Sequence, residues 1–164
     1  MKNKIKIDFA FNFHLDSDEI CNFYKKNWSN DIILGNKNYY KWNFIENPFN
    51  SKKDFNCLAV SQSNKILGIM GLSKRDFFLD KKKINGAELT TWVIDKNFRG
   101  KGLGKKMLIF LKINFDVLIG SGITDEEYTK TFKSIVYPYT FKNIDSRIRE
   151  IYGMSRTRHI CTQS

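Results

Sequence analysis

The stretch ELTTWVIDKNFRGKGLGKKMLIFLK, residues 88–112, joins an apolar strand to a helix through a basic, glycine-rich turn. The helix is expected to bury one face, because its apolar residues recur at helical spacing: Leu103, Met107, Leu108 and Leu111. Glycines stand at every second position from Gly100 to Gly104, and a residue without a Cβ leaves backbone N–H groups accessible. The first turn of a helix also has unpaired N–H groups and carries the positive end of the helix dipole. The turn is therefore predicted to bind an anion such as a phosphate or a pyrophosphate.

Two familiar phosphate-binding motifs do not fit this turn. A P-loop requires a glycine where Arg99 stands and a Ser or Thr where Lys106 stands. A dinucleotide-binding fingerprint requires a third glycine where Lys105 stands, together with an acidic residue on a second strand that would hold a ribose. The turn therefore belongs to a different class of anion site.

The spacing Arg99-x-x-Gly102-x-Gly104 resembles the R/Q-x-x-G-x-G/A signature of the GNAT superfamily of N-acetyltransferases, whose turn binds the pyrophosphate of acetyl-coenzyme A. The resemblance implies that acetyl-CoA, or another acyl-CoA, is the cofactor. It implies that backbone N–H groups of seven consecutive residues bind the pyrophosphate: Arg99, Gly100, Lys101, Gly102, Leu103, Gly104 and Lys105.

The same resemblance gives a role to the end of the preceding strand. In the superfamily, a splayed strand end offers backbone groups to the pantetheine arm, which corresponds here to Val93 and Ile94. One of these amides would also polarise the thioester carbonyl. The alternative for both residues is simple core packing, and the two interpretations are compatible.

The resemblance also implies two catalytic candidates. Glu88 precedes Arg99 by eleven positions, the spacing at which many GNAT proteins carry a glutamate that accepts the amine proton. A carboxylate in a strand of apolar and Thr residues needs a reason, although Glu88 could simply be an exposed residue at the start of the strand. The proton donor to the leaving thiolate is often a tyrosine, but the usual Y-x-x-x-G-F segment is absent here. Tyr128 is the candidate donor, and Tyr137 is the alternative.

The order of the predicted elements matches the superfamily along most of the chain. Alternating apolar residues predict a strand over residues 4–13, and Asp16 with Glu19 resembles a capping box that begins a helix over residues 17–28. The further predictions are a helix at 38–47, an antiparallel meander of strands at 55–61, 66–79 and 88–94, a helix from 103, a strand at 115–120 parallel to 88–94, and a helix at 125–136. The predicted class is α/β (α+β): a GNAT fold with a mixed, mostly antiparallel central sheet that is flanked by helices and splayed between its fourth and fifth strands.

Length and composition indicate one cytoplasmic domain. Residues 1–164 are predicted to form a single domain whose C-terminal part departs from the superfamily pattern or is truncated. No apolar run is long enough to span a membrane, and the N-terminus interleaves charged and apolar residues, unlike a signal peptide. Three widely spaced cysteines argue against a disulfide framework, and two histidines without a CxxC motif argue against a structural zinc site.

The sequence is compatible with three functions. The favoured one is an acetyl-CoA-dependent N-acetyltransferase that acts on a primary amine of a small molecule. The second is a GNAT-fold module that binds CoA without catalysis. The third, nucleic-acid binding, is suggested by a formal charge of +11. It is the weakest, because the basic residues are spread along the chain and the turn has Phe98 beside it but no interleaved aromatics.

A second resemblance concerns the acceptor. Residues 42–48 (WNFIENP) and 116–122 (DVLIGSG) are similar to segments of a GNAT subgroup associated with sugar-nucleotide and surface-polysaccharide biosynthesis. This implies an amino sugar attached to a nucleotide as the acceptor. The final strands of the fold are not evident in the sequence, which leaves two alternatives: the chain is a truncated piece of a longer enzyme, or a partner, for example in a homodimer, completes the sheet edge.

Overall fold

The computed structural model describes residues 5–79, 81–121 and 158–162. Within these residues the strands form one sheet in the order β1-β2-β3-β4-β5-β6. Their bounds are Lys6–Phe9 (β1), Cys57–Val60 (β2), Ile66–Leu79 (β3), Lys82–Ile94 (β4), Val117–Ser121 (β5) and Arg158–Thr162 (β6). Neighbouring strands are antiparallel except β4 and β5, which run parallel. The predicted mixed, mostly antiparallel sheet is confirmed.

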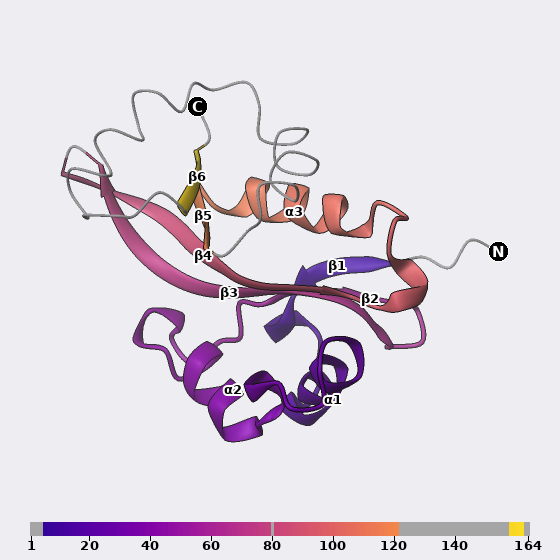
Figure 1. Ribbon diagram of the computed structural model, residues 1–164. Coiled ribbons are helices and arrows are strands. Elements are labelled where there is room, and N and C mark those ends of the chain that lie inside the picture. The colour runs from indigo at the N-terminus through magenta and orange to yellow at the C-terminus, as the bar shows by residue number, and fades with distance from the viewer. Residues whose placement is uncertain (1–4, 80, 122–157, 163–164) are drawn as a thin grey trace.

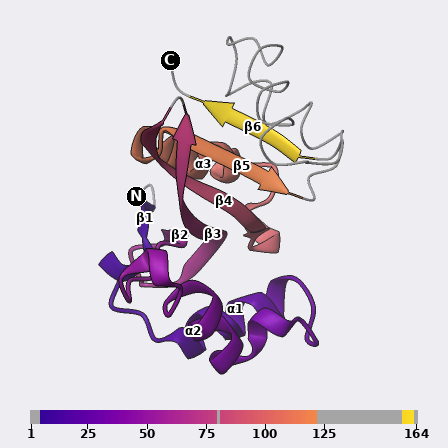
Figure 2. The same ribbon diagram turned by 90° about the vertical axis from the view of Figure 1, so that its left-hand side faces the viewer.

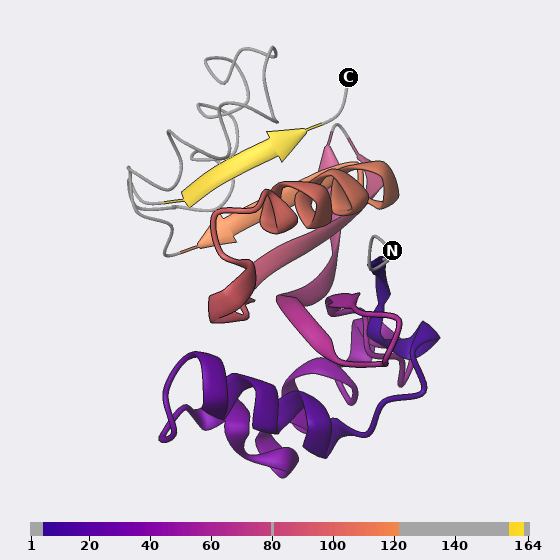
Figure 3. The same cartoon turned by 90° about the vertical axis from the view of Figure 1, so that its right-hand side faces the viewer.

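Helices cover both faces of this sheet (Figure 1). The α-helices are Ser17–Asn27 (α1), Lys37–Phe44 (α2) and Leu103–Asn114 (α3), and the short 3-10 helices are Ala10–Asn12 (η1), Ile33–Gly35 (η2), Pro48–Asn50 (η3) and Lys96–Phe98 (η4). α1 and α2 lie on one face and α3 lies on the other (Figures 1 and 3). None of the helices in the described part of the chain has the length and apolar character of a membrane span.

The start of α1 follows the predicted capping box. The side chain of Asp16 accepts a hydrogen bond from the first turn of the helix, and Glu19 accepts one from the backbone N–H of Asp16. This reciprocal arrangement satisfies N–H groups that a helix start otherwise leaves unpaired. The helix then buries Ile20, Phe23 and Tyr24 on one face, as their spacing requires.

Two hydrophobic clusters hold the layers together. On one face, α3 packs Leu103, Met107, Leu108 and Leu111 against residues of the sheet that include Met70, Leu72 and Ala87. On the other face, α1 and α2 pack Ile20, Tyr24, Tyr40 and Phe44 against Leu58, Ile69 and Val93. The sheet is therefore the middle layer of the domain, and both of its faces are buried over the central strands.

The first strand is shorter than predicted. β1 ends at Phe9, because the chain turns into η1 at Ala10 and the two-residue period of a strand ends there. Phe11 consequently lies 38% exposed, with its ring stacked on Phe9 at 5.6 Å, and does not share a buried face with the residues of β1. The second helix is also shorter than predicted, since it ends at Phe44.

The fourth strand, by contrast, is longer than predicted. β4 begins at Lys82 and not at the predicted residue 88, so residues 82–87 continue the hairpin with β3. One β-bulge interrupts this hairpin: Gly71 pairs with Thr91 and Leu72 pairs with Leu89, which leaves Thr90 as the extra residue. The extra residue directly follows Leu89, the last residue of β4 that pairs with β5.

β4 and β5 separate after a short parallel contact. Their register runs from Gly86 opposite Val117 to Leu89 opposite Gly120. The following part of β4, Thr90–Ile94, has no strand on the β5 side within the described residues. This is the predicted splay between the fourth and fifth strands, and β6 then lies beside β5 on its outer edge (Figure 2).

Candidate functional site

The glycine turn lies between the end of β4 and the start of α3. Gly100 and Gly102 have φ angles of 72° and 73°, in the left-handed region that residues with a Cβ adopt only with strain. A Cβ built on either residue would meet nothing within 4 Å. Both glycines are therefore needed for backbone conformation, and the space in front of them is open to a ligand.

Gly104 is needed for a different reason. A Cβ at this position would lie 2.5 Å from Cζ2 of Trp92 on β4. The absence of a side chain thus lets the first turn of α3 approach the strand closely. The three glycines that sequence analysis treated as one motif have two separate roles.

The start of α3 is left open by its own side chains. α1, α2 and η4 each begin with an Asp or Asn side chain that accepts a backbone hydrogen bond: Asp16, Asn36 and Asp95. The N-cap position of α3 is Gly102, which provides no side-chain cap, and the first turn of α3 contains no acidic residue. The amides of Leu103, Gly104 and Lys105 have no intrahelical acceptor at this position in a helix. An anion fits here, because it would accept these hydrogen bonds at the positive end of the dipole.

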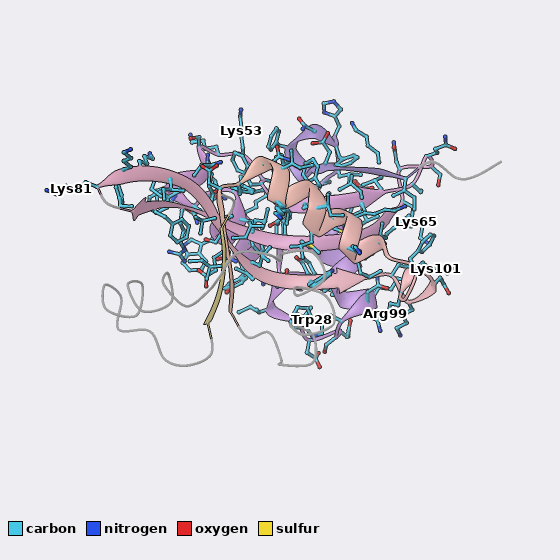
Figure 4. All side chains as sticks on the ribbon, turned by 90° about the horizontal axis from the view of Figure 1, so that it is seen from above. Trp28, Lys53, Lys65, Lys81, Arg99 and Lys101 are labelled. Atoms are coloured by element: carbon cyan, nitrogen blue, oxygen red, sulfur yellow. The ribbon has the colours of Figure 1, made fainter. Side chains whose placement is uncertain are left out.

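The side chain of Arg99 is committed to the protein itself. Its Nε donates to the backbone oxygen of Ile94 at 3.1 Å, and its Nη2 donates to the backbone oxygen of Asn27 at 3.0 Å. Arg99 therefore ties the end of β4 to the end of α1. Figure 4 shows Arg99 and Lys101 at one end of the molecule, with Trp28 nearby and Lys81 at the opposite end. Nε and Nη2 of Arg99 thus donate within the protein, while the resemblance implies a ligand contact through the backbone of Arg99.

Val93 and Ile94 point their side chains to opposite faces of the sheet. Val93 is buried with the α1 and α2 cluster, and Ile94 packs against the α3 cluster. Their backbone lies in the part of β4 that has no strand on the β5 side within the described residues. Core packing of the side chains is thus compatible with a ligand on the backbone, although the carbonyl of Ile94 already accepts from Arg99.

Glu88 lies in the middle of β4, not at its start. It stands opposite Ser73 on β3 and opposite Ile119 on β5, one residue before the last β4–β5 pair. Its Oε2 lies 3.1 Å from Nε of Arg75, and its side chain is 22% exposed. The alternative interpretation of an exposed residue at the strand start is therefore wrong. The structure places this carboxylate beside the opening between the two strands.

A group of buried hydroxyls at Tyr24, Thr90 and Thr91 was not predicted from the sequence. The hydroxyl of Tyr24 and Oγ1 of Thr91 lie 2.8 Å apart, and Thr91 Oγ1 also accepts from the backbone N–H of Gly71. Oγ1 of Thr90 is buried and has no hydrogen-bond partner in the described part of the chain. Burial raises the pKa of Tyr24 far above its ordinary value, so this phenol stays neutral. The pair of threonines in an otherwise apolar strand was the available signal.

A second buried polar group holds α2 on the sheet. Tyr40 donates a hydrogen bond to the carboxylate of Asp54, and Asn56 donates to the oxygen of Tyr40 at 2.7 Å. The Asn56 side chain also accepts from the backbone N–H of Leu72 at 2.7 Å. Burial raises the pKa of Asp54 to about 6.

The candidate proton donor Tyr128, its alternative Tyr137 and the predicted helix at 125–136 lie outside the described residues.

Comparisons with known proteins agree with this arrangement. Among solved structures, the PH1933 protein of Pyrococcus horikoshii OT3 is 21% identical with a TM-score of 0.58, over 98% of this chain and 99% of that one. A GNAT-family acetyltransferase of Staphylococcus aureus Mu50 is 16% identical with a TM-score of 0.57, over 98% and 100%. The glucosamine-6-phosphate N-acetyltransferase of Arabidopsis thaliana is 19% identical with a TM-score of 0.57, over 85% and 95%. These likenesses establish the fold.

The family follows from the sequence itself. A search of curated proteins gave no match. The family model described as the acetyltransferase (GNAT) family matches residues 17–115, which run from the start of α1 to the end of α3. This range includes the glycine turn, Glu88 and the splayed end of β4, and it is more than half of the chain. The chain therefore belongs to the acetyltransferase (GNAT) family.

Proposed function

We propose that the protein is an acetyl-CoA-dependent N-acetyltransferase whose acceptor is the primary amine of a small molecule. One observation carries the proposal: an uncapped helix start behind a glycine turn lies at the same opening of the sheet as Glu88. The first feature suits the pyrophosphate of the donor, and the second suits an amine that must lose a proton. Membership of a family that binds acetyl-CoA supports the same conclusion.

The donor would be held by backbone groups. The amides of residues 99–105 would bind the pyrophosphate, and the edge of β4 at Val93 and Ile94, which has no neighbouring strand on the β5 side in the described part of the chain, would bind the pantetheine arm. The bound donor supplies the acetyl group as a thioester and leaves as a thiol. A backbone amide on this edge would stabilise the negative charge that develops on the thioester oxygen.

The protein's own part in the reaction is the movement of protons. The amine nitrogen forms a bond to the carbonyl carbon as the carbon–sulfur bond breaks, so one proton leaves the nitrogen and one is required by the thiolate. Glu88 Oε2 would accept the first proton, directly or through water. Tyr128 is proposed as the donor of the second. Arg75, which holds Glu88 at 3.1 Å, fixes the position of the carboxylate.

An amino sugar is the acceptor we favour. The sequence segments at 42–48 and 116–122 support it, and one of the similar folds is that of a glucosamine-6-phosphate N-acetyltransferase. The alternative is a GNAT-fold module that binds CoA without catalysis. The cytoplasmic location, a single domain over residues 1–164 and a homodimer stay predictions from the sequence.

Two measurements test the proposal. Calorimetric titration with acetyl-CoA is expected to give saturable binding at micromolar to millimolar concentrations, and salt-sensitive binding of DNA without binding of acetyl-CoA would contradict it. Thiol release is then followed with amino sugars as acceptors. Glu88→Gln is expected to lower kcat by about 10²–10⁴-fold and to remove the acidic limb of its pH profile. An unchanged rate and pH profile would exclude Glu88 as the proton acceptor, and CoA binding without turnover of any amine would favour the inactive module.

A further inference from the structure

The sheet face that α1 and α2 cover becomes polar beyond the end of α2. Under the helices this face holds Ile69 and Val93, which belong to the apolar core. Beyond Phe44, where α2 ends, alternate positions of the strands place Ser73, Arg75 and Glu88 on the same face. Asn47 follows α2 and donates from Nδ2 to Oγ of Ser73 at 3.2 Å. The polar positions therefore continue the covered face into the region beside the opening of the sheet.

Arg75 is the positive group of this polar region. Its Nε lies 3.1 Å from Oε2 of Glu88, while 51% of the Arg75 side chain stays exposed. A guanidinium has five N–H donors arranged as a fork, so the contact with Glu88 leaves donors on its outer edge for a carboxylate or phosphate. A partly exposed ion pair contributes only about 0–1 kcal/mol to stability, which makes stability alone a weak reason for it.

The surroundings of the pair suit a small ligand. Glu88 stands opposite Ile119, and the next pair of residues, Leu89 with Gly120, is the last before β5 separates from β4. A small apolar cluster adjoins it on the same face: Phe77, Ile84, Val117 and Ile119. An acceptor at Arg75 and Glu88 would thus have an apolar wall on one side and the opening of the sheet on the other.

We infer that the acceptor carries an anionic group close to its amine, and that Arg75 binds this group while Glu88 faces the amine. The inference rests on the proposed function and specifies its substrate class. The pair of Arg75 and Glu88 has no net formal charge, and the chain as a whole carries +11, so an ammonium group alone gains little attraction here. A phosphate or carboxylate on the same molecule adds an attraction to Arg75 and to the charge of the chain. Polyamines and lysine-rich peptides are therefore expected to be poorer acceptors.

Two kinds of small molecule carry an anionic group together with a primary amine. A phosphorylated amino sugar supplies a phosphate, and an α-amino acid supplies a carboxylate next to the amine. Both can form paired hydrogen bonds with a guanidinium. The experiment therefore uses matched pairs that differ only in the anionic group: glucosamine 6-phosphate with glucosamine, and an amino acid with its amide. Spermidine serves as the cationic acceptor.

The test compares wild-type protein with Arg75→Gln and a matched control. Lys83→Gln removes one positive charge from the same hairpin, where Lys83 pairs with Asp76 at 2.7 Å on the opposite face of the strands. In wild type, kcat/KM for the better anionic acceptor is expected to exceed that of its neutral counterpart at least tenfold. Arg75→Gln should raise KM for the anionic member about 10–100-fold more than KM for the neutral member, in line with the loss of a charge-assisted hydrogen bond, while a fall in kcat from a less firmly held Glu88 should be the same for both members. Lys83→Gln should keep the preference.

The outcomes separate this inference from the function on which it rests. Equal use of neutral and anionic acceptors, or a preference for spermidine, overturns the inference while the transfer activity stands. An equal loss for both members in Arg75→Gln also overturns it, because Arg75 would then act only as the partner of Glu88. If no acceptor is acetylated, calorimetric titration of each matched pair into protein saturated with CoA decides: tighter binding of the anionic member supports the inference, and its absence overturns it. Failure to bind acetyl-CoA at all contradicts the proposed function itself.

Discussion

The guanidinium of Arg99 donates from Nη2 to the backbone oxygen of Asn27 over 3.0 Å, across 72 positions of the chain. A second hydrogen bond from Nε reaches the backbone oxygen of Ile94 at 3.1 Å. The first residue of the glycine motif thus joins the last residue of β4 to the last residue of α1. A basic residue in a glycine-rich turn is easily taken for a ligand contact, but here its guanidinium holds β4 and α1 in position.

Loss of the Arg99 side chain should destabilise the protein, because Arg99 connects the end of β4 to the end of α1. Arg99→Ala leaves two backbone oxygens without their donor and is expected to lower the free energy of unfolding by about 1–2 kcal/mol. Arg99→Lys should recover only part of that loss, because an ammonium lacks the planar fork that reaches both acceptors. Unfolding in urea measures the effect. Lys101→Ala is the control, since Lys101 lies over the Phe98 ring at 5.4 Å and its loss should change stability by less than about 0.5 kcal/mol. Equal stability of the two alanine variants would contradict the structural role of Arg99.

The two roles of the glycines can be separated by a double-mutant cycle. Gly104→Ala places a methyl group against the Trp92 ring and should cost about 1–3 kcal/mol through overpacking. Gly102→Ala meets no neighbour but forces a residue with a Cβ into a φ of 73°, which should cost about 1–2 kcal/mol. Each is combined with Trp92→Leu, and stability is measured in urea. The smaller side chain should relieve the cost at Gly104 and leave the cost at Gly102 unchanged. Equal coupling at both positions would show that the glycines share one role.

The local rules of the sequence predicted the parts of the fold that neighbours in the chain determine. Asp16 and Glu19 predicted the start of α1, because a capping box uses only residues within one turn. The start of β4 was missed because Asn85-Gly86 reads as a turn. In the fold, Asn85 donates from Nδ2 to the backbone oxygen of Asn114, and Gly86 pairs with Arg75 and Val117. Contacts with distant strands and with α3 therefore keep this dipeptide extended.

The candidate site likewise has one part that the local sequence predicts and another part that depends on distant contacts. The glycine turn was predictable, since its conformation and its helix start follow from residues within ten positions of one another. The partner of Glu88 was not predictable, because Arg75 comes close to it only in the hairpin register that pairs Leu79 with Lys82. The bulge at Thr90 was also hidden, although it determines which side chains of β4 face α1 and α2.

The cysteine thiol in β2 should be unreactive in the folded protein. Cys57 is fully buried, and burial raises the pKa of its thiol far above the ordinary value, so almost no thiolate is present near neutral pH. Iodoacetamide at pH 8 is expected to leave Cys57 unmodified in native protein and to modify it in urea, as peptide mapping by mass spectrometry would detect. Rapid labelling of Cys57 in native protein would contradict its burial. The result also bears on thiol-release assays, because a protected thiol adds nothing to their background.

Asp54 should make the stability of the protein depend on pH. Tyr40 donates to this buried carboxylate, and the backbone N–H of Asn56 donates to it at 3.0 Å, but desolvation outweighs both and raises its pKa from 3.8 to about 6. The folded state therefore binds a proton more tightly than the unfolded state. The resulting stabilisation is fully present below pH 4 and is lost as pH rises through 6. The shift of roughly two pKa units corresponds to a loss of roughly 3 kcal/mol.

Urea unfolding between pH 4 and pH 8 measures this dependence. Asp54→Asn should remove the decline between pH 4 and pH 6, because its amide does not titrate, while it can still accept from Asn56 and donate to the oxygen of Tyr40. Asp31→Asn, which removes an exposed carboxylate from the loop between α1 and α2, should keep the decline. Only the difference between the two variants isolates Asp54, since other groups titrate over the same range. The prediction would be contradicted if the free energy of unfolding of wild type rose from pH 4 to pH 6 in parallel with that of Asp54→Asn. The carboxylate would then be ionised in the folded state at acidic pH, because its hydrogen bonds with Tyr40 and Asn56 would outweigh the effect of burial.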